Sequence, residues 1–117
     1  MKTYIRSFFA IAPLPFLICS MGCRSRHVEI SVENRTGAEV RLLEVDYPNA
    51  SFGVDSLAAG QTTRSSVQVQ GSGELKVEYT APDRHQAQIT GPALVEKQEG
   101  KLAIVLLPAD KANFSFR

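Results

Sequence analysis

Tryptophan is absent from this 117-residue chain, and histidine and cysteine each occur only twice. The two histidines, His27 and His85, lie far apart, and neither belongs to a tight group of histidine, cysteine and aspartate residues. Zinc and copper sites draw mainly on imidazole and thiolate ligands at short spacings. The sequence therefore predicts no metal site and no cofactor.

Motifs for nucleophilic catalysis are also missing. Serines are plentiful, but no Gly-x-Ser-x-Gly elbow occurs, and Gly71-Ser72-Gly73 fits a hairpin loop. His85 alternates with Ala87 and Ile89, so the three side chains would point to the same side of a strand. We therefore expect His85 to cap the core at the strand end, with Asp83 as its hydrogen-bond partner. We predict that the protein is not an enzyme and has no catalytic residue.

The chain lacks an apolar run of the ~20 residues that a membrane-spanning helix needs. Its main apolar run, from Phe8 to Cys19, is shorter and contains two prolines, which interrupt helical hydrogen bonding. Two positive charges, Lys2 and Arg6, precede that run. A charged start, a short apolar centre and small residues before a cleavage point are the layout of an export signal.

Ser20-Met21-Gly22 leads from the apolar run into Cys23, and the segment resembles the signals of bacterial lipoproteins. In that family a small residue precedes a cysteine that takes a diacylglyceryl group. Gly22 and Cys23 match the pattern, and Ser20 stands where leucine is usual. The resemblance implies a signal peptide over residues 1–22, cleavage between Gly22 and Cys23, lipidation of Cys23, and a short tether over residues 23–27.

Two other interpretations of this segment stay open. An ordinary export signal would be cut between Ser20 and Arg24, and an uncleaved segment would act as an anchor. Three Asn-x-Ser/Thr triplets, at Asn34, Asn49 and Asn113, favour the ordinary secretory interpretation. Such triplets are glycosylation acceptors in eukaryotic secreted proteins.

Charge is nearly balanced. Without Lys2 and Arg6 the chain keeps eleven basic and twelve acidic residues, so it lacks the basic footprint of a nucleic-acid-binding protein. Cys23 to Arg117 comprises 95 residues, which is enough for one compact core. We expect a single domain over residues 28–117 and no nucleic-acid partner.

Period-two alternation dominates this domain. Apolar and polar residues alternate from Val28 to Glu33 and again from Leu75 to Thr80, the pattern of half-buried strands. Turn residues recur at short intervals, and no helical periodicity of useful length occurs. The sequence predicts an all-β fold, a single small antiparallel β-sandwich of about seven strands.

Three details of these strands are predicted as well. The adjacent Leu42 and Leu43 shift the parity of the segment 38–47, which indicates a β-bulge or a strand that changes sheets. Gly91-Pro92 is expected to end the strand that begins near residue 86. The continuous apolar run from Leu102 to Leu107 predicts a strand covered on both faces.

In pattern alone, the domain resembles immunoglobulin-like or transthyretin-like extracytoplasmic domains, without the Cys and Trp residues of a true immunoglobulin domain. That resemblance implies an architecture and no activity. Tyr47, Phe52 and Tyr79 are candidates for a ligand-facing aromatic set, with burial in the core as the alternative.

These features lead to one expected function. The chain is expected to be a lipoprotein of the bacterial cell envelope, anchored to a membrane on its extracytoplasmic side through Cys23, and to act as a non-catalytic module that binds or assembles with an envelope protein. The alternatives are a small-ligand or substrate-handling accessory domain, and an ordinary secreted β-sandwich protein.

Overall fold

The computed structural model describes residues 26–117, which form eight strands and no helix. Cys23 and the predicted signal over residues 1–22 lie outside the described residues. No helix suited to crossing a membrane occurs in the described part. The strands in chain order are β1 Val28–Asn34, β2 Val40–Tyr47, β3 Ala50–Leu57, β4 Thr62–Val67, β5 Gly73–Thr80, β6 Gln86–Leu94, β7 Gly100–Leu107 and β8 Lys111–Phe116.

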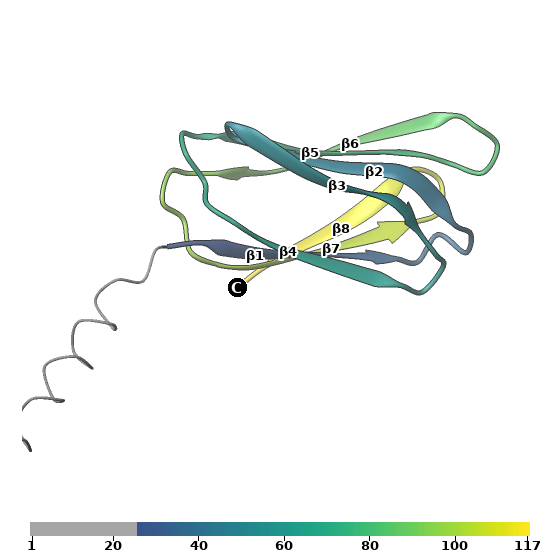
Figure 1. The fold of residues 1–117 in the computed structure, drawn as a ribbon, viewed down its shortest axis with the longest axis horizontal. Coiled ribbons are helices and arrows are strands. Elements are labelled where there is room, and N and C mark those ends of the chain that lie inside the picture. The colour runs from purple at the N-terminus through teal and green to yellow at the C-terminus, as the bar shows by residue number, and fades with distance from the viewer. Residues whose placement is uncertain (1–25) are drawn as a thin grey trace, which may run out of the picture.

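The strands form two four-stranded sheets that lie in two layers (Figure 1). One sheet has the order β4-β1-β7-β8 and the other has the order β3-β2-β5-β6. The two-layer arrangement fits a β-sandwich, and the all-β prediction is confirmed. The structure has one strand more than the expected seven. Its sheets are also not wholly antiparallel, because β1 and β7 pair in parallel.

A single apolar core joins the two sheets. Strand β1 shows the alternation that its sequence predicts, since Val28, Ile30 and Val32 are fully buried while Glu29 and Ser31 are not. Burying each aliphatic side chain of this kind stabilises the fold by about 1.5–3 kcal/mol before entropic costs. The core residues are Val28, Ile30, Val32, Val40, Leu43, Val45, Leu57, Val67, Val69, Leu75, Val77, Tyr79, Ala87, Leu94, Leu102, Ile104 and Leu106.

The predicted bulge is present in β2. The register between β2 and β5 shifts between Arg41 and Glu44, and Leu42 has a φ of 50° with 65% of its surface exposed. The extra residue points away from the core, so that Leu43 and Val45 remain buried. The bulge thus keeps both halves of the strand facing the same core.

Two strand predictions are wrong in detail. Strand β6 does not end at Gly91-Pro92 but continues to Leu94, because a second register shift, between Glu74 and Lys76 of the neighbouring strand, accommodates the extra length. Strand β7 has only one fully buried face. Ala103, Val105 and Leu107 are half-buried, because they face outward from the sheet.

The domain has two ends, each formed by loops and strand termini (Figure 1). The tether end contains the start of β1 and the loops over residues 48–49, 68–72 and 95–99. The distal end contains the loops over residues 35–39, 58–61, 81–85 and 108–110. Because β1 and β7 are parallel and in register from Val28 with Gly100 to Asn34 with Leu106, the loop after β7 lies at the opposite end from the start of β1.

Candidate functional site

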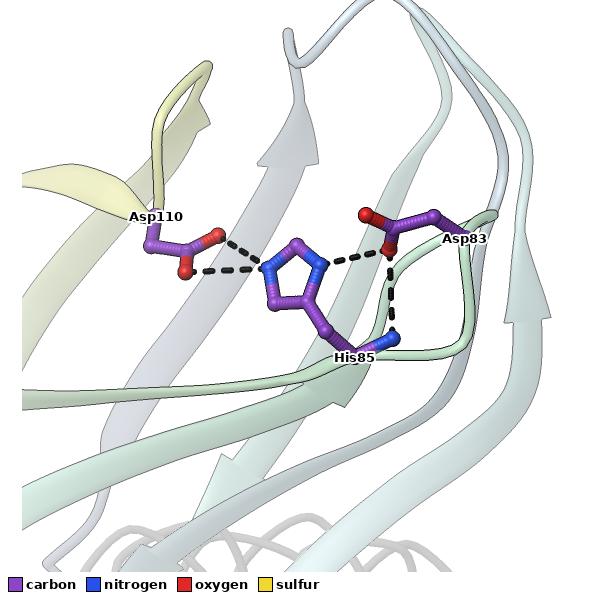
Figure 2. A network of polar contacts seen from close by, with 3 residues as sticks. All are labelled: Asp83, His85 and Asp110. Carbon is purple, nitrogen blue, oxygen red and sulfur yellow. Dashed lines mark hydrogen bonds and ion pairs between the residues drawn. The ribbon is translucent and has the colours of Figure 1, made fainter.

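The distal end places one histidine between two aspartates, shown in Figure 2. His85 Nδ1 lies 2.5 Å from Asp83 Oδ1, and His85 Nε2 lies 2.9 Å and 3.0 Å from the two carboxylate oxygens of Asp110. Asp83 and His85 belong to the loop between β5 and β6, whereas Asp110 belongs to the loop between β7 and β8. These three residues, the His85 bridge, link a loop of one sheet to a loop of the other.

The local backbone explains why these side chains converge. The 81–85 loop is closed by hydrogen bonds from the Ala81 N–H to the His85 carbonyl and from the Arg84 N–H to the Ala81 carbonyl, both 2.9 Å. The Asp83 carboxylate also accepts the backbone N–H of His85 at 3.1 Å. Aspartate commonly bonds the backbone two residues ahead in this way. Asp83 is therefore held beside the imidazole by its own turn.

Asp110 is positioned by a different kind of turn. The loop over residues 108–110 follows Leu107, which pairs with Lys111. Ala109 and Asp110 have φ values of 67° and 57°, so two consecutive residues occupy the left-handed region. Three-residue loops are common in β-hairpins. The turn places the Asp110 carboxylate beside His85, which belongs to a loop of the other sheet.

Charge–charge contacts shift the titration of the bridge. The pKa of His85 is raised above its ordinary value by hydrogen bonding to Asp110 first and to Asp83 second. The pKa of Asp83 is lowered, mainly by the hydrogen bond from the His85 backbone and then by that from its side chain. Both residues are exposed, so solvent screens their interaction.

A small notch adjoins the bridge. It has a volume of about 170 Å³ and opens where the two sheets meet at the distal end. Burial, and secondly the charge of Asp110, raise the pKa of Tyr79, so this phenol stays protonated. The residues lining this distal notch are Thr36, Ala38, Val40, Tyr79, Ala81, Pro82, His85, Leu107, Pro108, Ala109 and Asp110.

Asn34 connects the loops around the notch. Its side chain is fully buried and donates to the carbonyls of Ala38 at 2.8 Å and Leu57 at 2.9 Å. Its carbonyl oxygen accepts the backbone N–H of Thr36 at 3.0 Å and the Thr36 hydroxyl at 2.7 Å. A buried amide is tolerated because all these groups are paired. Its burial also makes Asn34 unsuitable as a glycosylation acceptor in the folded protein.

The three candidate aromatics do not form one site. Tyr79 is a core residue that also lines the distal notch. Tyr47 and Phe52 lie in the hairpin of β2 and β3, where they are half-buried and their ring centroids are 6.4 Å apart. Two of the three therefore pack together away from the notch.

Part of the His85 bridge is predictable from the sequence. Asp83 is the expected partner of His85, and that hydrogen bond is present. The expected capping of the core is wrong, because the side chain of His85 is 46% exposed. Asp110 is not predicted, because it lies 25 residues from His85 and no local pattern places the two loops side by side.

Two other polar features are not predicted by the sequence. Glu44, Asp46 and Glu78 bring carboxylate oxygens within 4.8 Å of one another on the outer face of β2 and β5. At the tether end, an open hollow of about 730 Å³ lies between three loops. Its lining residues are Arg26, Asn49, Gln68, Val69, Gln70, Gly71, Glu96 and Lys97.

Comparison with known proteins gives a structural match without a family. Neither a family model nor a curated protein sequence matches the chain. Its structure is similar to that of a protein from Eubacterium rectale solved by NMR, with a TM-score of 0.56 and 16% sequence identity over 78% of this chain and 88% of the other. At this identity the likeness concerns the fold alone.

Proposed function

We propose that the protein is a lipoprotein of the bacterial cell envelope, anchored through Cys23, that binds an envelope protein with its distal end and catalyses no reaction. The observation that supports this proposal most is the placement of the His85 bridge and notch at the end opposite the start of β1. Binding residues often lie on loops held by a rigid scaffold.

The tether fixes how far the domain can move from a membrane. Only four residues, Arg24 to His27, separate Cys23 from Val28, and a fully extended chain of this length spans at most ~18 Å. Strand β1 then carries the chain ~20 Å further toward the distal end. A lipid at Cys23 would therefore hold the domain close to the bilayer with its notch facing away.

Anchoring would aid binding without adding contacts. A single acyl chain gives only reversible attachment, whereas two chains give a stable one, as on the diacylglyceryl cysteine of the lipoproteins that this signal resembles. Holding the domain at a surface raises its effective concentration toward a partner on the same surface. This effect suits a binding module with a small contact site.

Lipidation is tested with Cys23→Ala in the full-length chain. We expect the unaltered protein to sediment with membranes and to carry a diacylglyceryl group at Cys23 by mass spectrometry. We expect Cys23→Ala to lack that group and to keep residues 1–22, because in the lipoproteins that this signal resembles the cysteine is lipidated before the signal is cut. An unaltered protein whose N-terminus lies downstream of Cys23 without lipid would refute the anchor.

Binding through the distal end is tested separately by photo-crosslinking in intact cells. A photoreactive residue at Glu39, an exposed distal position, should capture an envelope protein. The matched control is the same residue at Arg64, exposed in the middle of β4. Equal capture at both positions, or none at Glu39, would contradict a distal binding surface.

A second function is favoured by the hollow at the tether end. Its volume of about 730 Å³ lies within the ~300–1,000 Å³ of small-molecule sites, which supports the small-ligand alternative. Gln68 and Gln70 would provide hydrogen-bonding amides there. Ligand-induced NMR shifts confined to the three tether-end loops would favour this function over distal binding.

A further inference from the structure

We propose that the distal notch binds a lysine side chain of the partner protein, whose ammonium group bridges the Asp110 carboxylate and the Nε2 atom of His85. The inference rests on the proposed function, because it names the chemistry of the partner at the same end of the molecule. It also explains why a histidine stands between two carboxylates.

The His85 bridge contains more acceptors than protons when its imidazole is neutral. A neutral imidazole carries one N–H donor and one acceptor nitrogen. Asp83 Oδ1 accepts the backbone N–H of His85 and lies 2.5 Å from Nδ1, which favours the tautomer with its proton on Nδ1. The unprotonated Nε2 then faces the two oxygens of Asp110 at 2.9 Å and 3.0 Å. Nε2 and the two Asp110 oxygens are then all hydrogen-bond acceptors, and no proton lies between them.

A donor from outside resolves this conflict when the imidazole is neutral. Lysine offers three N–H donors on one nitrogen, whereas arginine offers a planar fork that suits two parallel bonds. Both Asp110 oxygens converge on a single nitrogen position in the structure. That position is held by Nε2 itself, so the ammonium would lie beside the pair, where one of its three N–H groups can reach an Asp110 oxygen and another can reach Nε2.

The notch accommodates the rest of the lysine side chain. Val40, Leu107 and Pro108 give it apolar walls beside the Asp110 carboxylate. Its volume of about 170 Å³ is below the ~300–1,000 Å³ range of small-molecule sites, so it suits one side chain of a partner. Lysine buries its methylene stem along apolar surface while its charged end reaches a polar group.

Protonation of His85 competes with the lysine. An imidazolium donates from both nitrogens and satisfies Asp110 without an external ligand. The charges that act most on His85 are those of Asp110 and Asp83, and both raise its pKa. The titratable or charged residues on its own loop and on the elements that surround it are Asp83, Arg84, Tyr79, Arg35, Glu39, Arg41, Asp110 and Lys111. Lysine binding is therefore weaker in acid and stronger once His85 has lost its proton.

The experiment uses the full-length chain in detergent micelles, labelled with ¹⁵N, with a metal chelator present. Acetyl-lysine-methylamide is the probe, and acetyl-norleucine-methylamide, which has the same stem without the charge, is its control. At about pH 9, where imidazole is neutral, the lysine probe should shift amide resonances in residues 79–85 and 107–111. The norleucine probe should not shift them.

The pH dependence and three variants complete the test. Affinity for the lysine probe should fall about twofold to fivefold at about pH 5, the range that exposed ion pairs provide. This fall should disappear in His85→Ala. Asp110→Asn should bind both probes equally weakly, while Asp55→Asn, which alters an exposed aspartate of β3 outside the notch, should behave as the unaltered protein does.

Three outcomes would overturn the inference: equal shifts from the two probes, an affinity of the unaltered protein that does not vary with pH, or a loss in Asp55→Asn as large as in Asp110→Asn. None of them bears on lipidation, since the probes are free in solution. Conversely, an unaltered protein without a diacylglyceryl group at Cys23 would refute the anchor and leave the lysine site intact.

Discussion

Asp110 and His85 are separated by 25 residues in sequence, yet both carboxylate oxygens of Asp110 lie within 3.0 Å of His85 Nε2. Asp110 follows β7 in one sheet, and His85 precedes β6 in the other. The contact therefore links the two layers at the distal end, as Figure 2 shows in close view. Its strength depends on the protons of the imidazole, and therefore on pH.

The contribution of the His85 bridge to stability should be largest in mildly acidic solution. The pKa of His85 is raised from 6.5, so its contribution is fully present below 6.5 and is lost as pH rises through the raised value. The pKa of Asp83 is lowered from 3.8, so its contribution is present above 3.8 and is lost as pH falls through the lowered value. Between these two ordinary values both contributions are complete.

Thermal unfolding of the unaltered protein and of His85→Ala at a series of pH values measures this effect. The difference in melting temperature should be greatest between pH 3.8 and 6.5 and should shrink in alkaline solution. A difference that grows with rising pH would contradict the sign of the His85 shift.

Replacement of Asn34 should cost much more stability than replacement of an exposed asparagine. Asn34→Ala removes four side-chain hydrogen bonds and leaves the buried carbonyl of Leu57 without this donor, while the part-buried carbonyl of Ala38 keeps the Thr36 hydroxyl at 3.0 Å. Leaving buried polar groups unpaired costs about 1–3 kcal/mol each, so we expect a loss of about 3 kcal/mol in urea unfolding. Asn113→Ala, at an exposed position of β8, should change stability by less than about 0.5 kcal/mol.

A methyl group at Gly91 should disturb the contact between β6 and β8. A Cβ atom there would lie 2.7 Å from Phe114 Cε2 and 3.1 Å from Leu75 Cδ2. Overpacking of this kind costs about 1–3 kcal/mol, which denaturant unfolding of Gly91→Ala would measure. The control is Gly73→Ala, where the nearest atom of Pro48 is 3.7 Å away.

A smaller side chain at position 114 tests whether the ring of Phe114 causes the loss of stability in Gly91→Ala. Phe114→Leu is destabilising by itself, because Phe114 packs on the core, but the double variant with Gly91→Ala should lose less than the sum of the two single losses. Additive losses would show that the ring of Phe114 is not what the new methyl group meets.

Features that depend on local alternation are predictable from the sequence, whereas those that depend on long-range pairing are not. The parity break at Leu42 and Leu43 is enough to locate the bulge in β2, since buried residues must stay on one face. The parallel pairing of β1 with β7 joins segments about seventy residues apart, and no local pattern encodes it. Asp110 escapes prediction for the same reason, whereas Asp83 lies only two residues from His85 and is predicted as its partner.

Three acidic side chains lie close together on the outer face of β2 and β5. Glu44 and Glu78 are direct partners across the two strands, and Asp46 lies within 4.8 Å of both. Like charges opposite one another destabilise a sheet, and opposite charges stabilise it by about 0.2–1 kcal/mol. Glu78→Lys should therefore raise the free energy of unfolding by about 0.5–1 kcal/mol at low salt, and this gain should shrink at high salt as the charges are screened.

Glu74→Lys, at an exposed position of β5 that faces Ala93 on β6, is the matched charge reversal and should change stability less. A loss of stability in Glu78→Lys, together with stabilisation of only the unaltered protein by a divalent cation, would instead identify the three carboxylates as a cation site.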